Sequence, residues 1–253
     1  MNITGNTILI TGGGSGIGRG LAEALHAKGN HVIIAGRRKA LLEEVTEANP
    51  GMKSLVLDIE TAGAIRSLAV RLASEFPALN VLINNAGIMR MEDLLAQQDD
   101  LSDAESIVTT NLLGPIRLTA ALLPLLRKQA HSTIINVSSG LAFIPLAMTP
   151  TYSATKAGLH SYTLSLRYQL KGTTTEVLEI VPPYVQTDLL NGSEDPRAMP
   201  LKDYIAETME LLSAQPTPAE ICVKNVHPLR FADQSGKFDA VFTGLNDAMS
   251  GGH

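Results

Sequence analysis

The sequence of 253 residues is short of cysteine and of clustered positive charge. Cys222 is its one cysteine, so no disulfide can form within the chain, and we interpret this thiol as a packed residue in a reducing compartment. The net charge is -5, and Lys and Arg do not gather in long runs. This pattern gives no support to a broad nucleic-acid surface or an electrostatic membrane anchor.

Targeting segments and long apolar runs are absent as well. A strand of buried type, residues 7–11, begins almost at once, and no basic region, apolar run and cleavage site precede it. No apolar stretch approaches the roughly 20 residues that span a bilayer. The histidines, His227 among them, lack metal-ligand spacing, so no metal is expected. We therefore expect a cytoplasmic protein whose partners are small molecules and copies of itself, in a homodimer or homotetramer.

What the sequence does contain is an alternation of short β-branched apolar runs with longer amphipathic segments. Strands are predicted at 7–11, 31–35, 54–58, 81–84, 133–138 and 176–181, and helices at 17–28, 38–48, 61–74, about 103–128, about 150–171 and about 200–213. Continuously apolar strands separated by helices predict an α/β fold of one domain, 1–253, with a doubly wound parallel sheet and helices on both faces. Pro115 and Pro124 should bend or split the fourth helix.

The segment between the first strand and the first helix is rich in glycine. Glycines allow a tight turn that brings backbone N–H groups against a pyrophosphate, at the positive end of the helix beginning near Ile17. A G-x-G-x-x-G spacing does not occur here, but T-G-x-x-x-G-x-G does. The alternative is a flexible turn. The residues expected to contact a dinucleotide are Thr11, Gly12, Gly14, Ser15, Gly16, Ile17 and Gly18.

The end of the second strand predicts which dinucleotide binds. Enzymes that use NAD place a carboxylate there to hold the ribose 2′-hydroxyl. This sequence has Ala35-Gly36-Arg37-Arg38 instead, and a guanidinium can hold a 2′-phosphate. We expect NADP(H) to be preferred, with NAD(H) as the alternative and with Arg37 as the first candidate. The competing interpretation is that Arg37 and Arg38 are solvated residues that open the next helix.

Tyr152 is followed four residues later by Lys156, which places both side chains on one face of a helix. A free phenol has a pKa near about 10, and a close ammonium lowers it by favouring the phenolate. Lysine would then tune the tyrosine rather than act as a nucleophile. Tyr-x-x-x-Lys alone is common on exposed helices, so the surrounding motifs decide whether this pair is catalytic or accidental.

The glycine motif, Asn84-Asn85-Ala86-Gly87 after the fourth strand, and Tyr-x-x-x-Lys occur in the order found in the short-chain dehydrogenase/reductase family. The chain resembles that family from about Asn6 to about Leu190. The resemblance implies a Rossmann-type fold and hydride transfer from a nicotinamide to a carbonyl carbon, with oxidation of the alcohol as the reverse. Its C-terminal end is similar to that of oxidoreductases encoded beside D-alanine esterification genes, and no seventh strand can be placed there.

The resemblance also implies roles for single residues. Tyr152 would donate the proton, Ser139 would polarise the substrate oxygen with Ser138 as the competing candidate, and Lys156 would also touch the nicotinamide ribose. Asn111 matches an asparagine that bends a helix and holds a water leading to the lysine; the alternative is a polar residue that bonds locally. The remaining cofactor positions implied are Asp58, Ile59, Asn85, Ala86, Gly87, Pro182, Val185 and Thr187. Pro183 replaces a glycine of the family and puts the path of that loop in doubt.

The segments expected to surround the substrate are apolar. Residues 141–148 contain no cation, and Tyr184, Leu189 and Leu190 would form the opposite wall. We expect a small neutral ketone or aldehyde, or the matching alcohol, with residues 191–200 as a lid. These apolar residues could instead pack against another subunit, and Arg90, Arg197 or Lys202 could supply a charge. A non-catalytic NADP sensor and a nucleotide-sugar epimerase are the rival functions.

Overall fold

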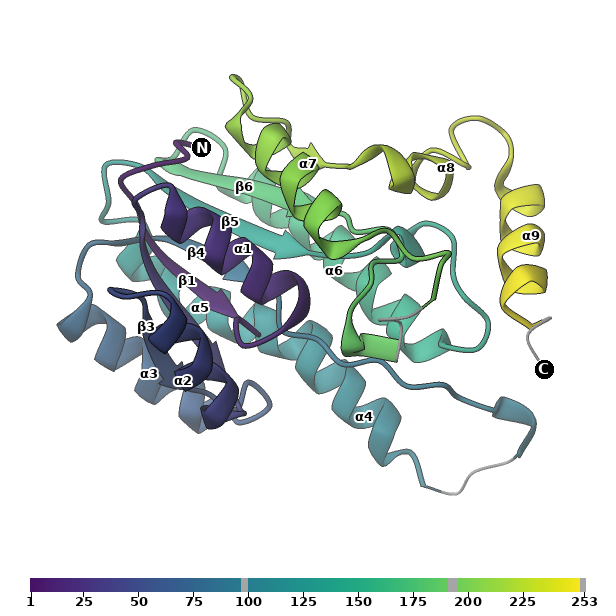
Figure 1. Cartoon of the computed structure of the whole chain (residues 1–253), viewed down its shortest axis with the longest axis horizontal. Helices are drawn as coiled ribbons and strands as arrows, with labels where there is room; N and C mark the ends of the chain where they lie inside the picture. The colour runs from purple at the N-terminus through teal and green to yellow at the C-terminus, as the bar shows by residue number, and fades with distance from the viewer. Residues whose placement is uncertain (97–99, 191–194, 251–253) are drawn as a thin grey trace.

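A parallel sheet forms the centre of the computed structural model, which describes residues 1–96, 100–190 and 195–250 (Figure 1). Its seven strands lie in the order β3-β2-β1-β4-β5-β6-β7, and every neighbouring pair is parallel. The strands are β1 Thr7–Thr11, β2 His31–Gly36, β3 Lys53–Val56, β4 Leu79–Asn84, β5 Ser132–Val137, β6 Thr175–Ile180 and β7 Glu220–Ile221. The strand order reverses between β1 and β4, where a doubly wound sheet opens its ligand crevice at the strand carboxyl ends.

Helices cover both faces of this sheet. They are α1 Gly16–Ala27, α2 Lys39–Ala48, α3 Ala62–Glu75, α4 Ser102–Val108, α5 Gly114–Leu126, α6 Pro150–Gln169, α7 Leu201–Ser213, α8 His227–Arg230 and α9 Phe238–Ser250. Side chains alternate along a strand, so Ile8 and Ile10 pack into a core beneath α1, α2 and α7. Leu9 faces the other core, which α3, α5 and α6 complete. The predicted fold class is therefore confirmed.

The fourth predicted helix is interrupted, as its prolines led us to expect. A π-helical turn, Thr109–Leu113, joins α4 to α5, and Pro115 stands in the first turn of α5, where a missing N–H removes no helical hydrogen bond. Pro124 lies inside α5 without ending it. The π turn places Asn111 inside a bend of the chain rather than in a regular helix.

The combined helical run Ser102–Leu126 differs from the expectation that no stretch could span a membrane. It is 25 residues long, and an 18-residue window within it has a mean hydropathy of 1.3. Length and composition alone would therefore allow a membrane span. In the structure, however, Leu118, Leu122 and Leu126 are fully buried against the sheet. In all, 44% of that window is buried, and the run packs in the core through these leucines.

The C-terminal part contains elements that the sequence pattern did not predict. β7 is two residues long and pairs with the end of β6, with Glu220 opposite Glu179. Beyond it the chain forms α8 and then α9, which lies at one end of the molecule (Figure 1). The expected lid falls partly on residues 191–194, which lie outside the described residues. In the part that follows, Met199 bridges to Val185.

Candidate active site

A cavity of about 520 Å³ opens at the carboxyl ends of the central strands. The predicted residues that line it are Thr11, Gly12, Gly14, Ser15, Gly16, Ile17, Gly18, Arg37, Arg38, Ile59, Asn85, Ala86, Gly87, Ser139, Tyr152, Lys156, Pro182, Val185 and Thr187. Asp58 and Asn111 are not among the lining residues. One continuous space thus joins the glycine loop to the Tyr-x-x-x-Lys pair.

The glycine loop is tied directly to the segment that follows β4. The Thr11 hydroxyl accepts hydrogen bonds from the backbone N–H groups of Asn85 and Ala86, both at 3.0 Å. A Cβ on Gly18 would come within 2.3 Å of the Gly12 carbonyl oxygen, and Gly12 has a φ of 69°. Only glycine fits at both positions, because the backbone strands approach each other too closely for a side chain. This close approach fits a dinucleotide whose pyrophosphate lies against the start of α1.

Two arginines stand at the nucleotide end of the cavity, directly after β2. The Arg38 guanidinium donates to the Ser15 hydroxyl of the glycine loop at 2.7 Å. The Arg37 guanidinium contacts the Glu60 carboxylate at 3.3 Å, with its side chain 55% exposed. Both arginines line this end of the cavity, and Arg38 contacts the glycine loop whereas Arg37 contacts Glu60.

Asp58 makes local contacts in the structure. Its carboxylate accepts hydrogen bonds from the Glu60 N–H at 3.1 Å and from the Thr61 hydroxyl at 3.2 Å, in the turn that leads into α3. The neighbouring Ile59 lines the cavity. The adenine contact expected of Asp58 therefore stays a prediction, while its turn contacts are established.

Tyr152 and Ser139 meet at the floor of the cavity. Tyr152 is 6% exposed and comes from α6, while Ser139 follows β5. Burial raises the pKa of the Tyr152 phenol to about 12, and a hydrogen bond with the Ser139 hydroxyl opposes that rise. A buried phenol with such a pKa keeps its proton at neutral pH. It can therefore donate that proton to an oxygen placed beside it.

Lys156 lies one helical turn after Tyr152 and is also buried. Its ammonium donates to the Val137 carbonyl oxygen at 2.8 Å and lies 5.5 Å from the centre of the Tyr152 ring. Burial lowers the pKa of Lys156 to about 8, and the negative charge of Glu179 opposes that fall. The lysine is thus largely charged at neutral pH and loses its proton in the mildly alkaline range.

The expected effect of Lys156 on Tyr152 requires a correction. We expected the ammonium to lower the pKa of the phenol, but in the structure that pKa is raised. The causes that act on the phenol are its burial, which raises the pKa, and the Ser139 hydroxyl, which lowers it.

The two candidate serines have different partners. The Ser138 hydroxyl donates to the Glu179 carboxylate, away from Tyr152. The Ser139 hydroxyl accepts from the Leu141 N–H at 3.1 Å and bonds with Tyr152. Ser139 is therefore the serine whose hydroxyl stands beside the phenol. Its geometry suits an oxygen held between a hydroxyl and a phenol.

Asn111 is fully buried in the π turn and holds the chain after β4. Its side-chain oxygen accepts from the Ile88 N–H at 2.9 Å, and its amide donates to the Ile88 carbonyl at 2.8 Å and to the Thr155 hydroxyl at 3.3 Å. A Cβ on Gly87 would lie 3.4 Å from the Asn111 oxygen and 3.7 Å from the Lys156 ammonium. Asn111 thus lies next to the lysine but is bonded to backbone.

The loop after β6 follows the cavity despite its second proline. The Gly140 N–H donates to the Pro182 carbonyl at 2.8 Å, and Pro183 itself lines the cavity. Thr187 packs close to the glycine loop, since a Cβ on Gly16 would lie 3.3 Å from its methyl group. Pro183 is therefore accommodated without moving Thr187 away from the nucleotide end.

The substrate end of the cavity is apolar. Of the expected residues, Leu141, Leu146, Tyr184 and Leu189 line it, while the side chain of Leu190 lies outside the described ones. Burial raises the pKa of the Tyr184 phenol as well.

Among the lining residues that the sequence did not predict are Leu229, Leu245 and Met249 of the C-terminal part. The last two come from α9, whose Asn246 accepts from the Ala147 N–H at 2.6 Å. Spacing of four residues between Val241, Leu245 and Met249 was the signal that could have revealed this helix.

Charged residues near the substrate end are few among those described. Arg90 lines the cavity, and its guanidinium lies 3.9 Å from the Asp103 carboxylate. Arg197 is held by Asp195 at 2.7 Å and donates to the Ala248 carbonyl at 2.9 Å, which places it against α9. Three cations were considered from the sequence. Arg90 lines the cavity, whereas Arg197 and Lys202 do not.

Comparison with known proteins gives one family. The model described as short chain dehydrogenase matches residues 6–198. Among curated relatives, the chain is 38% identical over 251 residues to the uncharacterized oxidoreductase DltE of Bacillus subtilis strain 168, covering 97% of this chain and 98% of that protein. It is 34% identical over 180 residues to the NADP-dependent 3-hydroxy acid dehydrogenase YdfG of Shigella flexneri, covering 70% and 72%.

Among solved structures, a short chain dehydrogenase of Burkholderia cenocepacia J2315 in complex with NADP superimposes with a TM-score of 0.81. The two sequences are 25% identical, and the match covers 97% of this chain and 99% of the other.

Proposed function

The chain belongs to the short-chain dehydrogenase family, and from this premise we propose that it interconverts a small, neutral, apolar carbonyl compound and the matching alcohol with NADP(H). The class of reaction is that of an NAD(P)-dependent oxidoreductase acting on CH–OH and C=O groups. The observation that carries the proposal is the continuous cavity in which Tyr152, Ser139 and Lys156 stand between the glycine loop and an apolar wall.

NADP(H) is the preferred cofactor, and NAD(H) is the alternative. The glycine loop and the residues after β4 form a cradle in which several positions carry no side chain, and Arg37 and Arg38 border its nucleotide end. The relative from Shigella flexneri is NADP-dependent by name, and the Burkholderia cenocepacia structure holds NADP. Thr11, Asn85, Pro182 and Thr187 would line the rest of the bound dinucleotide.

When bound, the nicotinamide supplies the hydride. The chain's own residues supply the proton and the orientation. Tyr152, protonated at neutral pH, donates its proton to the carbonyl oxygen, and the Ser139 hydroxyl holds that oxygen beside the phenol. Lys156, charged below about pH 8, stabilises the phenolate left on Tyr152. In the oxidative direction the same groups accept the proton of the alcohol.

The substrate class follows from the apolar residues at the Tyr152 end of the cavity. Leu141, Leu146, Leu229, Leu245 and Met249 border that part of the cavity. A neutral apolar skeleton would fill this space, and a carboxylate would lose its hydration there unless Arg90 paired with it.

Kinetics on matched substrates test this proposal. Each pair shares one skeleton and differs in a neutral or a carboxylated end, and kcat/KM is measured with NADPH for both. We expect higher kcat/KM for the neutral members. Consistently higher values for the acids would contradict the neutral-substrate class, and pairing with Arg90 would then be tested with Arg90→Ala.

A non-catalytic NADP sensor is the second candidate to distinguish. It has no need for Ser139, Tyr152 and Lys156 in one apolar floor, so their contacts favour the enzyme. NADPH consumption against a panel of ketones and aldehydes separates the two.

We further propose a cytoplasmic homodimer or homotetramer, which light scattering after size exclusion would check.

A further inference from the structure

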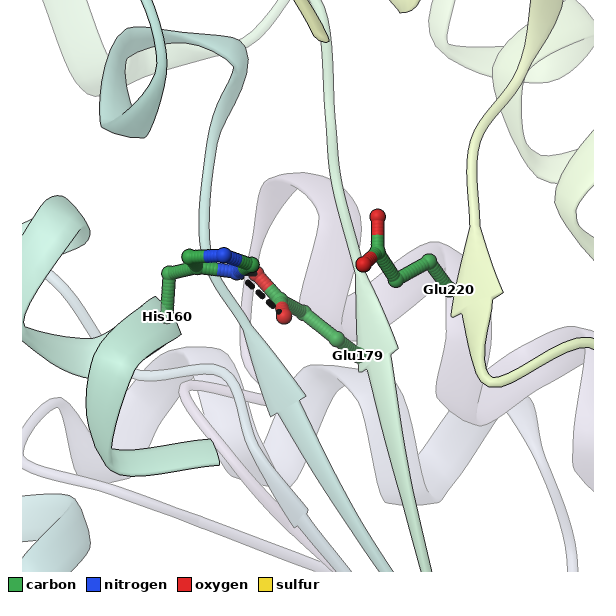
Figure 2. Close-up of side chains that lie close together, drawn as sticks. All are labelled: His160, Glu179 and Glu220. Carbon is green, nitrogen blue, oxygen red and sulfur yellow. Dashed lines mark hydrogen bonds and ion pairs between the residues drawn. The ribbon is translucent and has the colours of Figure 1, made fainter. Parts of the chain in front are cut away.

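A second group of ionisable side chains lies behind the catalytic floor. His160 of α6, Glu179 of β6 and Glu220 of β7 point toward one another (Figure 2), with one ligand-type atom of each within 4.8 Å of the others. Glu179 is 0% exposed, and its carboxylate contacts the His160 ring nitrogen Nδ1 at 2.8 Å. A carboxylate buried this completely requires partners of its own, because its desolvation is otherwise costly.

A metal ion is one occupant that such a group could hold, but the surrounding contacts argue against it. Glu220 already forms an ion pair with Arg230, whose second contact to that carboxylate is 3.0 Å, and the pKa of Glu220 is lowered mainly by this guanidinium. Arg230 in turn lies over the Phe143 ring, 4.4 Å from its centre, and this ring packs against His160. The pairing with Arg230 already compensates one carboxylate, and a divalent cation would have to displace the guanidinium.

The contacts of Glu179 lead instead toward the reacting groups. Its carboxylate accepts from the Ser138 hydroxyl, and Ser138 directly precedes Ser139. His160 lies on α6 one turn after Lys156, which itself follows Tyr152 by one turn. Glu179 therefore joins the strand end that carries Ser139 to the helix that carries Lys156 and Tyr152.

We propose that Glu179 is a positioning residue of the reaction: its buried carboxylate fixes the end of β5 through Ser138 and supplies the negative charge that keeps Lys156 protonated. This inference rests on the proposed function, since it concerns the same lysine. Lys156 is 4% exposed and its direct partner is the neutral Val137 carbonyl, so a nearby fixed anion helps to hold the ammonium charged.

The charged and titratable groups that face Glu179 come from three elements or their flanks. They are His160 and Lys156 of α6, Glu220 of β7 with Cys222 just beyond it, and Arg230 of α8. Arg230 is held by Glu220, and burial raises the pKa of the Cys222 thiol, which keeps it neutral. Glu179 is thus the anion whose charge acts on Lys156.

The test replaces Glu179 by an isosteric neutral residue. Glu179→Gln keeps an oxygen for the Ser138 hydroxyl but removes the charge. The matched control is Glu176→Gln on the same strand, where Glu176 pairs with the chain's amino terminus. The protonation of Lys156 is read by NMR in protein labelled with ¹³C at lysine Cε, its signal being identified by its loss in Lys156→Arg, and kcat/KM is measured from pH 6 to 9.

We expect the Lys156 titration in Glu179→Gln to move to lower pH by about half a unit or more, while Glu176→Gln leaves it in place. The alkaline limb of kcat/KM should move with it, so that activity at pH 8.5, taken relative to activity at pH 6, is about two- to threefold lower in Glu179→Gln than in the unmodified protein. A purely structural role would lower kcat/KM equally at every pH. Coincident titrations in the unmodified protein and in Glu179→Gln would overturn the proposal.

The NMR titration needs no turnover, so it separates this inference from the proposed reaction. If carbonyl reduction is absent, the proposed function fails, while the lysine titration still decides the role of Glu179. Should Glu179→Gln not fold, the unmodified protein provides a second measurement. The carboxyl carbon signal of Glu179 should shift at the pH at which Lys156 loses its proton, and a flat signal there would reject the proposal.

Discussion

At the scale of single residues, the floor of the cavity depends on one phenolic hydrogen. Tyr152→Phe keeps the ring that packs against Met89 and Leu146 but removes the proton donor. We expect kcat to fall about 10²- to 10⁴-fold, the range that a positioned acid contributes. NADPH affinity should remain nearly unchanged. Stopped-flow turnover and fluorescence titration of NADPH check both parts.

The control for that substitution stands on the same helix. Tyr168 of α6 is 79% exposed, and Tyr168→Phe should leave kcat and NADPH affinity as they are. Turnover by Tyr152→Phe close to that of the unmodified enzyme would remove Tyr152 from the proposed mechanism.

Arginine charge at the nucleotide end leads to a prediction about cofactor choice. Arg37→Ala should narrow the NADPH over NADH preference by about 1–3 kcal/mol, the scale of a hydrogen bond to a charged group. Because Arg38 contacts Ser15 of the glycine loop, Arg38→Ala tests the second candidate in the same way. Dissociation constants of both dinucleotides are measured for each variant.

Lys39→Ala is the matched control for the arginine variants, since Lys39 pairs with Glu43 and does not line the cavity. Equal affinities for NADPH and NADH in the unmodified protein would reject the cofactor assignment. A preference that survives loss of both arginines would place the selectivity elsewhere.

At the scale of elements, the glycine loop and the start of α1 approach each other so closely that a methyl group does not fit between them. A Cβ on Gly18 would meet the Gly12 carbonyl oxygen and, at 2.4 Å, the Asn85 amide. Gly18→Ala should therefore lower the free energy of unfolding by about 1–3 kcal/mol and weaken NADPH binding. Urea denaturation with and without NADPH measures both effects.

Gly63 provides the opposite case within a helix. It lies in α3, and its nearest neighbour would be the end of the Arg66 side chain at 4.0 Å, so Gly63→Ala should raise stability by roughly 0.5–1 kcal/mol. If Gly63→Ala changed the stability in the same way as Gly18→Ala, close packing at Gly18 would not be the cause of the loss of stability.

The α9 helix leads to a prediction about substrate size. Leu245 and Met249 border the apolar end of the cavity, so Leu245→Ala and Met249→Ala should lower kcat/KM most for bulky apolar substrates. Each removed side chain is expected to cost about 1–3 kcal/mol of discrimination between a large and a small ketone. Thr243→Ala, on the exposed side of α9, is the control, and equal losses for both ketones would contradict a direct contact.

At the scale of the whole molecule, the dinucleotide should act as a stabilising ligand. At about 100 times its dissociation constant, NADPH should add about 2.7 kcal/mol to the free energy of unfolding. For a chain of this size each kcal/mol raises Tm by about 2–4 °C, so calorimetry should show a rise of roughly 5–10 °C. NADH at the same concentration should give a smaller rise, and identical shifts would contradict the preference for NADPH.

The sequence predicted the sheet well because its central strands are buried on both faces and read as continuous apolar runs. β1 begins and ends as expected, and the other five predicted strands differ only at their ends. β7 could not be predicted, because a strand of two residues has no periodicity of its own. Its pairing with β6 depends on α8 and on the Glu220–Arg230 contact, which form only in the folded chain.

The candidate site likewise has a part that the sequence predicted and a part that it did not. Motifs at fixed spacing predicted the residues around the glycine loop and Tyr152, because residues that lie together in space there are also close together in the sequence. Burial could not be predicted, and it reverses the expected shift in the pKa of Tyr152. Leu229 and Met249 were missed since no local pattern says which cavity a C-terminal helix covers.

The position of α9 also has a consequence for the order in which the protein is made. A ribosome completes the glycine loop, β1 and β2 early, whereas Leu245 and Met249 emerge long afterwards. Because β1 to β6 precede α9 along the chain, the residues that line the nucleotide end are all made before the α9 residues that wall the substrate end. A chain that stopped before α9 would keep the residues of the glycine loop but would lack Leu245 and Met249, which pack against the cluster that contains Tyr152.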